Sequence, residues 1–312
     1  MEQVGRRTVL RSVAAAAMTA LAAKAARRAM TIHFTPGSIG VKADQRESIE
    51  LAARYGFEAV EPFAGYLAQI SESEVAGIVE EVRGKNLVFG NAGLTVEFRR
   101  GDDAFRQGLT AFPATVKRLR QAGVTRVTTW ISPAHDTLTY LQNMKQHAAR
   151  LREVATILGD QGQRLGLEYV GPKTLWASRR YPFVHCMAEM RDLIGEIGRP
   201  NVGFVMDSWH WYTAGEGEAE LLTLKKEDVV SIDLNDAPAG LAIDQQIDSA
   251  RELPMATGVI NMALFLNTLH KIGCDAPARC EPFNAKLRAM PKEEAVAATA
   301  AAMKKAFAVV GA

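Results

Sequence analysis

Short apolar runs alternate with longer segments of helical periodicity from residue 30 to the end of the chain. The apolar runs are at most eight residues long, as is usual for buried strands. Strands are expected at 30–34, 57–62, 87–89, 124–131, 165–168, 202–207, 229–233 and 278–281. The intervening periodicity predicts helices at 44–55, 72–83, 104–122, 138–158, 184–197, near 219–225, and at 262–272 and 293–310. Pro113 is expected to break the third helix or to start a new one.

The alternation predicts an α/β fold, a single (β/α)8 TIM barrel over residues 30–312. Eight strand–helix units in about 280 residues match this fold, which typically takes about 250. A doubly wound sheet is the rival, and it would more often carry a glycine-rich phosphate loop after its first strand. Residues 36–40, Pro-Gly-Ser-Ile-Gly, lack the spacing of that loop. The barrel is therefore the better prediction.

Composition supports a globular protein and excludes one class of partner. The chain is 48% apolar and 23% charged, which is ample for a core. Its net charge is +2, and no long basic run follows the first thirty residues, so we expect no nucleic-acid partner. The three cysteines are too few and too scattered for a disulfide framework or a zinc cluster, and they are interpreted as small buried side chains.

Residues 1–29 have the features of a targeting segment. Arg6 and Arg7 precede an alanine-rich apolar stretch at 12–23, and Ala23-Lys24-Ala25 fits a small-x-small cleavage site. The paired arginines resemble a twin-arginine signal, an address and not an anchor. We expect a periplasmic or exported protein without a stable membrane anchor, since a span needs about 20 apolar residues. The alternative is an alanine-rich helix that stays attached to a cytoplasmic protein.

Four acidic residues end the last four predicted strands. They are Glu168, Asp207, Asp233 and Glu281. An unpaired charge at the end of a buried strand is costly, so four of them call for an explanation. In a parallel barrel all carboxyl ends of the strands lie on one face, where active sites form. Carboxylates that converge there predict a site for a divalent cation.

The motifs around these acids resemble those of a known family. They read Leu167-Glu168-Tyr169, Met206-Asp207-Ser208-Trp209-His210, Ile232-Asp233-Leu234-Asn235-Asp236 and Cys280-Glu281-Pro282-Phe283. Their order resembles that in the xylose isomerase-like sugar-phosphate isomerase and epimerase barrels, which include ketose 3-epimerases, hydroxypyruvate isomerases and inosose dehydratases. The resemblance covers roughly residues 30–310.

The resemblance implies a metal site and several substrate contacts. Glu168, Asp207, Asp233 and Glu281 would bind Mn²⁺ or Mg²⁺, with Co²⁺ as a further option. The Asp-x-x-His pattern implies that His210 contacts substrate, and Arg251 matches an arginine that precedes a Pro-Gly-x-Gly loop in the family.

Three positions depart from the family pattern. Asp233 stands where the family usually has histidine, and four carboxylates favour Mg²⁺ or Mn²⁺ over zinc. The loop itself is altered to Pro-Met-Ala-Thr-Gly at 254–258, which puts the substrate clamp in question. Thr174 replaces a second glutamate of the 3-epimerases.

The implied reaction removes a proton next to a carbonyl group and gives an enediolate. A divalent ion would stabilise the developing charge. Glu168 and Glu281 would act both as ligands and as the acid and base. Trp130 and Glu61, near the ends of the predicted strands at 124–131 and 57–62, are further candidates for contact with a small sugar or polyol.

Each site residue also has a purely structural interpretation. Glu168 and Glu281 could form ion pairs with Arg279 or Lys173. Asp207 could cap the following helix, and Asp233 could serve in a turn. His210 alone would more often be a packed histidine.

Three functions remain open at this stage. The leading one is a metal-dependent isomerase or epimerase of a small sugar or polyol ketone. A lyase resembling inosose dehydratase would use the same enediolate, and an exported sugar-binding barrel would not turn substrate over. A three-zinc endonuclease IV type of hydrolase is disfavoured because the chain has only six histidines. The sequence leaves open whether the protein forms a homo-oligomer.

Overall fold

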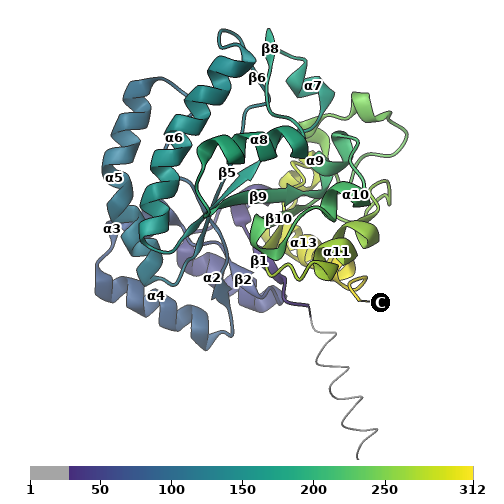
Figure 1. Cartoon of the computed structure of the whole chain (residues 1–312). Helices are drawn as coiled ribbons and strands as arrows, with labels where there is room; N and C mark the ends of the chain where they lie inside the picture. Colours follow the sequence, from purple (N-terminus) through teal and green to yellow (C-terminus); the bar gives the residue numbers. More distant parts are fainter. Residues whose placement is uncertain (1–27, 312) are drawn as a thin grey trace, which may run out of the picture.

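The computed structural model describes residues 28–311, and the predicted signal segment at 1–29 lies outside them except for its last two residues. Parallel strands form one sheet surrounded by helices (Figure 1). The strands of this sheet are β1 (Thr31–Phe34), β2 (Ala59–Val60), β3 (Val88–Phe89), β4 (Ala92–Gly93), β5 (Arg126–Trp130), β7 (Arg164–Glu168), β9 (Val202–Asp207), β10 (Val229–Leu234) and β11 (Pro277–Cys280). The longer helices are α2 (Gln45–Tyr55), α4 (Glu72–Gly84), α5 (Asp102–Gln121), α6 (Tyr140–Asp160), α8 (Met187–Ile197), α11 (Met262–Lys271) and α13 (Lys292–Phe307).

The pairing order of the sheet is that of a barrel. It runs β3-β2-β1-β11-β10-β9-β7-β5-β4. The two strands at its ends, β3 and β4, are separated along the chain only by Gly90 and Asn91. β3 lies within the predicted strand at 87–89 and pairs with β2, whereas β4 lies beyond the predicted strand and pairs with β5. The α/β TIM-barrel prediction is therefore confirmed for the fold.

Burial explains why the strands read as continuous apolar runs. Every residue of β9 and β10 is buried, because one side faces the barrel interior and the other faces helices. The helices bury one face only. In α6 this face includes Leu151, Val154 and Leu158, which follow one another at helical spacing.

Pro113 does not break its helix, so that expectation was wrong. The helix α5 is continuous through it. Proline removes one backbone hydrogen bond. The apolar face nevertheless continues on both sides, with Phe105, Phe112, Val116 and Leu119 all buried. Tertiary packing of this face outweighs the local cost of the proline.

Several short elements were absent from the sequence prediction. They are α3 (Ala64–Gln69), α7 (Lys173–Trp176), α9 (Ser208–Thr213), α12 (Ala285–Ala289), β6 (Ala134–His135) and β8 (Tyr181–Pro182), whereas the helix predicted near 219–225 is present as α10 (Glu218–Leu221). β6 and β8 form an antiparallel pair beside α7, above the barrel in Figure 1. Most of these elements follow strand ends, where they build the rim around the site.

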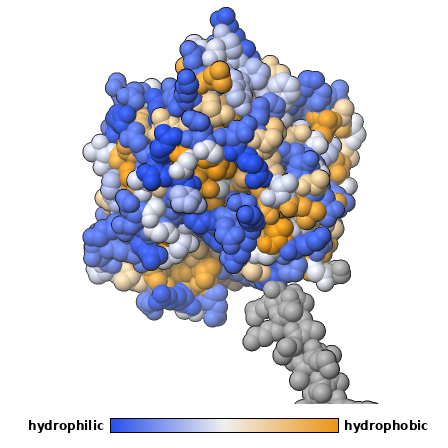
Figure 2. All heavy atoms as spheres, viewed as in Figure 1, coloured by the Kyte–Doolittle hydropathy of each residue, from blue (hydrophilic) through white to orange (hydrophobic). Residues whose placement is uncertain are grey.

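The surface is largely polar. Figure 2 shows hydrophilic side chains over most of this face, with smaller apolar areas between them, as is usual for exposed protein surface. None of the helices in residues 28–311 is both long and apolar enough to cross a membrane. Among the three cysteines, Cys274 and Cys280 are buried and Cys186 is half-buried, all with free thiols.

Candidate active site

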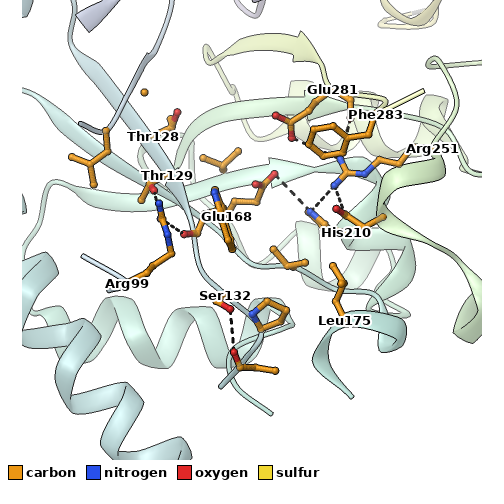
Figure 3. Close-up of a pocket in the computed structure, with 18 of the residues that line it drawn as sticks. Arg99, Thr128, Thr129, Ser132, Glu168, Leu175, His210, Arg251, Glu281 and Phe283 are labelled. Atoms are coloured by element: carbon orange, nitrogen blue, oxygen red, sulfur yellow. Dashed lines mark hydrogen bonds and ion pairs between the residues drawn. The ribbon is translucent and has the colours of Figure 1, made fainter. Parts of the chain in front are cut away.

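A pocket of about 610 Å³ lies at the carboxyl ends of the strands. Its charged lining residues are Arg99, Glu168, Arg179, Asp248, Arg251, Arg279 and Glu281, together with His210. Figure 3 shows Glu168, His210, Arg251 and Glu281 gathered on one side, with Arg99 and Thr129 on the other. The size suits a small ligand, and the two glutamates lie at one end of the pocket.

The structure brings the four predicted acids together. One carboxylate oxygen from each of Glu168, Asp207, Asp233 and Glu281 lies within 4.8 Å of the others. The two glutamates line the pocket, whereas Asp207 and Asp233 are 1% and 0% exposed and lie behind them. Strand order explains the convergence, because β7, β9, β10 and β11 are neighbours in the sheet.

Asp207 begins the helix α9 at the end of β9. Its Oδ1 accepts hydrogen bonds from the backbone N–H groups of Trp209, at 2.6 Å, and His210, at 3.4 Å. The capping interpretation of this residue is therefore confirmed. The Asn235 amide also donates to both carboxylate oxygens, at 3.2 and 3.1 Å. Burial raises the pKa of Asp207 to about 6, against the opposing charge of Arg251.

Arg251 enters the site from the loop before α11. Its Nη1 donates to Asp207 Oδ2 at 2.8 Å, and its Nη2 donates to Asp248 Oδ1 at 2.6 Å. Nη1 also lies 3.8 Å from Glu281 Oε2. The guanidinium is stacked against the rings of Trp209 and Phe283, at 4.8 and 4.7 Å from the ring centroids. Three carboxylates thus share one buried cation.

Asp233 has a different partner. Arg279 Nε donates to Asp233 Oδ1 at 2.8 Å, and Arg279 Nη2 donates to Asp233 Oδ2 at 2.7 Å. The same Nη2 lies 3.0 Å from Glu281 Oε1. The ion pair predicted for Glu281 with Arg279 is therefore present, but the stronger, two-point contact of Arg279 is with Asp233.

Glu168 is the least neutralised of the four acids. Its Oε1 is buried and accepts no hydrogen bond, and it lies 4.0 Å from His210 Nε2. Burial raises the pKa of Glu168 well above its usual range, and the charges of Asp233, Glu281 and Asp207 add to the effect. Burial also raises the pKa of Glu281 to about 7, against the opposing charge of Arg279. Burial therefore favours the protonated form of both carboxyl groups.

His210 is buried on α9 and faces the acids. Its Nε2 lies 3.1 Å from Arg251 Nη2, and its Nδ1 accepts a hydrogen bond from the Gly171 N–H at 3.2 Å. Burial lowers the pKa of His210 well below its usual range, and Arg251 adds to the effect. Gly171 makes this approach feasible, because a Cβ there would lie 2.4 Å from the His210 carbonyl oxygen and 2.8 Å from Thr213 Oγ1.

The two remaining candidates differ in position. Trp130 is 46% exposed, lines the pocket and stacks on the Arg99 guanidinium, with 4.5 Å to the ring centroid. Glu61 is not among the described residues that line the pocket. Burial raises the pKa of Glu61 to about 7, against the charge of Arg279. Lys173, considered as a partner of the glutamates, instead pairs with Asp244 at 2.6 Å.

The altered loop at 254–258 is held by a residue outside the predicted site. Asp236 accepts hydrogen bonds from the backbone N–H groups of Thr257, Gly258 and Ile260, at 2.8 to 3.0 Å. This network fixes the segment that follows Arg251. Asp236 ends the same motif as Asp233, so the aspartate-rich turn was the available signal.

Sequence reasoning also missed Asn235, Asp248 and the main role of Arg279. Asn235 bridges two acids, since it donates to Asp207 and its Oδ1 accepts from the Glu281 N–H at 3.0 Å. The signal for Arg279 was its spacing: residues two apart on a strand point to the same face, so Arg279 and Glu281 share the interior. No comparable signal marks Asp248, which begins a short 3-10 helix (Asp248–Ala250) between β10 and α11.

Comparison with known proteins places the chain in a family. The model of the xylose isomerase-like TIM barrel family matches residues 49–306. A xylose isomerase domain protein from Alicyclobacillus acidocaldarius is 30% identical, with a TM-score of 0.80 over 90% of this chain and 99% of that one. An inosose isomerase of Bacillus velezensis is 23% identical over 278 residues, 86% of this chain and 93% of the relative.

A structure of the IOLI protein with a bound zinc atom has a similar fold. It is 19% identical, with a TM-score of 0.74 over 89% of this chain and 98% of that one. At this identity the likeness concerns the fold alone. The family match and the 30% identical structure carry the assignment, and this chain belongs to the xylose isomerase-like TIM barrel family.

Proposed function

We propose that the protein is an isomerase or epimerase of a small sugar or polyol ketone. It would move a proton on carbon next to a carbonyl group, through an enediolate. The observation that carries the proposal is the placement of Glu168 and Glu281 in one pocket, on separate strands, both with raised pKa values. Two such carboxyl groups can remove a proton and return it. Because some relatives are inosose isomerases, inososes, which are ketones of inositols, are the first substrates to test.

The donor set fits a divalent cation. The buried Glu168 Oε1 has no partner, and carboxylate oxygens from Asp207 and Glu281 lie within 4.8 Å of a ligand oxygen of Glu168. Carboxylates favour Mg²⁺ or Mn²⁺, although the related IOLI protein holds zinc. When bound, the cation would stabilise negative charge that develops on the substrate oxygens.

The other pocket residues would bind and orient the substrate. Arg251 and His210 offer polar atoms beside the acids, and Arg251 is fixed in place by Asp207 and Asp248. Trp130 and Phe283 supply apolar surface that can pack on a sugar ring and exclude water.

Solvent-deuterium exchange tests the proposal. The purified protein, supplied with Mn²⁺ or Mg²⁺, is incubated in deuterated water with a panel of inososes and ketoses. We expect deuterium at the carbon next to the carbonyl group of at least one compound, with an isomerised or epimerised product. A product that lacks one molecule of water relative to the substrate would instead indicate the lyase alternative. Tight sugar binding without any exchange would contradict the proposal and support the binding-barrel alternative.

We also propose that residues 1–29 direct export of the barrel domain at 30–312. The paired arginines and the apolar stretch that follows support this. Cell fractionation of the full chain and of an Arg6→Lys, Arg7→Lys variant tests it. We expect the mature protein outside the cytoplasm only when the two arginines are present.

A further inference from the structure

The four acids at the base of the pocket differ in how they contact arginine, and this difference bears on which of them can bind a cation. We infer that Asp233 is the fixed counter-ion of Arg279 and not a cation ligand, so that Glu168, Asp207 and Glu281 form the divalent-cation site. The inference rests on the cation in the proposed function. It concerns which residues bind that cation.

The contact between Asp233 and Arg279 uses both carboxylate oxygens. Two guanidinium nitrogens donate to them at 2.8 and 2.7 Å, one nitrogen to each oxygen. This parallel, two-point geometry is the strongest arrangement between these groups. Asp233 is fully buried and, like Asp207, does not line the pocket among the described residues, so the two-point contact is what sets it apart. To bind a cation it would have to leave a guanidinium whose other carboxylate contact is with a single oxygen of Glu281.

The pair is also built into the sheet. Asp233 on β10 and Arg279 on β11 are directly opposite each other in the parallel pairing. Their side chains therefore leave neighbouring strands at the same level and on the same side. Arg279 is held further by Glu281 Oε1, at 3.0 Å. The position of Arg279 next to Asp233 follows from strand register and does not depend on a flexible loop.

In the described part of the chain, none of the other three acids makes a two-point contact with a single guanidinium. Glu168 is only 6% exposed, and its Oε1 has no partner. Asp207 accepts hydrogen bonds from Asn235 and from the Trp209 N–H, but only one guanidinium bond, at Oδ2 from Arg251, whose charge is shared with Asp248. Glu281 Oε2 lies 3.8 Å from the same guanidinium, beyond hydrogen-bond distance. An unpartnered buried carboxylate oxygen is the feature that a cation would satisfy.

This ligand set predicts a specific pattern of Mn²⁺ affinity. Arg279→Met should strengthen binding about tenfold, because a nearby positive charge is lost and Asp233 is freed to bind the cation. Asp233→Asn should weaken binding by a similar factor, because the unpaired guanidinium then repels the cation. Removing both partners should cancel these effects and leave the affinity within about threefold of the wild type.

Isothermal titration of the full chain with Mn²⁺ decides the question. The paired variant carries Asp233→Asn and Arg279→Met together, and each substitution is also measured alone. Asp207→Asn is the matched control that removes a ligand. Circular dichroism checks that each variant folds. A second paired variant carries Asp233→Asn and Arg279→Gln together. Its two side-chain amides can hydrogen-bond to each other, and it supplies the same test if the first paired variant does not fold.

The inference expects near wild-type affinity in the paired variant and a loss of at least about a hundredfold in Asp207→Asn. It is overturned if the paired variant loses as much as Asp207→Asn, because Asp233 would then be a ligand. Failure of the wild-type protein to bind Mn²⁺ would also overturn it. Proton exchange is measured separately, so a protein that binds Mn²⁺ as expected but exchanges no proton would contradict only the proposed isomerase function.

Discussion

Arg251 and Asp207 form a buried ion pair at the base of the pocket. Arg251 Nη1 lies 2.8 Å from Asp207 Oδ2, and the two side chains are 1% and 0% exposed. The arginine lies on a loop, whereas the aspartate ends a barrel strand and begins α9. The pair therefore attaches the long segment after β10 to the rigid barrel. It also places a positive charge beside the proposed acid and base.

Replacing Arg251 should destabilise the protein strongly. Arg251→Met leaves Asp207 buried without its cation, and the loss of one partner of such a pair typically costs about 3–5 kcal/mol. Urea unfolding followed by circular dichroism measures the change. Arg54→Met is the control, because its ion pair with Glu293 is exposed to solvent and contributes little to stability. Equal free energies of unfolding for the two variants would contradict the structural role.

The close approach of the segment after β7 to α9 should depend on Gly171. In Gly171→Ala the new Cβ would meet the His210 carbonyl oxygen at 2.4 Å, so the backbone must move and displace His210. We expect a loss of about 1–3 kcal/mol in stability and weaker substrate turnover.

Gly77→Ala is the matched control for this change. Gly77 is exposed on α4, a Cβ added there would have no heavy atom within 4 Å, and alanine favours helix by about 1 kcal/mol. Thermal unfolding should therefore shift in opposite directions for the two variants. A stabilising effect of Gly171→Ala would show that the two segments are not in contact.

The protein should become less stable as the pH is lowered from about 6.5 to about 4, partly because of His147. Burial lowers the pKa of His147 to about 4, from an ordinary value of 6.5. The unfolded chain therefore binds a proton at a higher pH than the folded protein does. The contribution is fully present above pH 6.5 and is lost as the pH falls toward 4, with an upper limit of about 3 kcal/mol.

His147→Gln tests the assignment, because glutamine does not titrate. Urea unfolding at several pH values between about 4 and 7 should show a shallower dependence on pH in the variant than in the wild type. His135→Gln is the control, since His135 is only half-buried near the rim of the barrel. An unchanged slope in His147→Gln would mean that other groups cause the acid destabilisation.

The sequence was most informative where burial alone determines structure. The strand at 202–207 was predicted with the bounds of β9, because a fully buried parallel strand is one continuous apolar run. The break between β3 and β4 at Gly90 and Asn91 has no such signal. Pro113 shows the opposite failure, since its local preference was overridden by packing of the apolar face of α5.

The four acids could be predicted from their positions at strand ends, and their spatial grouping follows from the barrel. Their partners could not be predicted in the same way. Arg251 reaches Asp207 from 44 positions further along the chain, and Asp248 joins it from the same segment. The pairing of Asp233 with Arg279 required the register between β10 and β11, which depends on the closed sheet. Long-range register is a property of the fold and not of any local pattern.

The central claim is that Glu168 and Glu281 transfer the proton. Its most direct test is the rate of deuterium incorporation into a substrate identified from the inosose and ketose panel, for Glu168→Gln and Glu281→Gln beside the wild type. Glu80→Gln is the control, because this residue is exposed on α4 and does not line the pocket. We expect both site variants to slow exchange by about 10²–10⁴-fold while the control keeps the wild-type rate. Exchange at the wild-type rate in either site variant would contradict the claim.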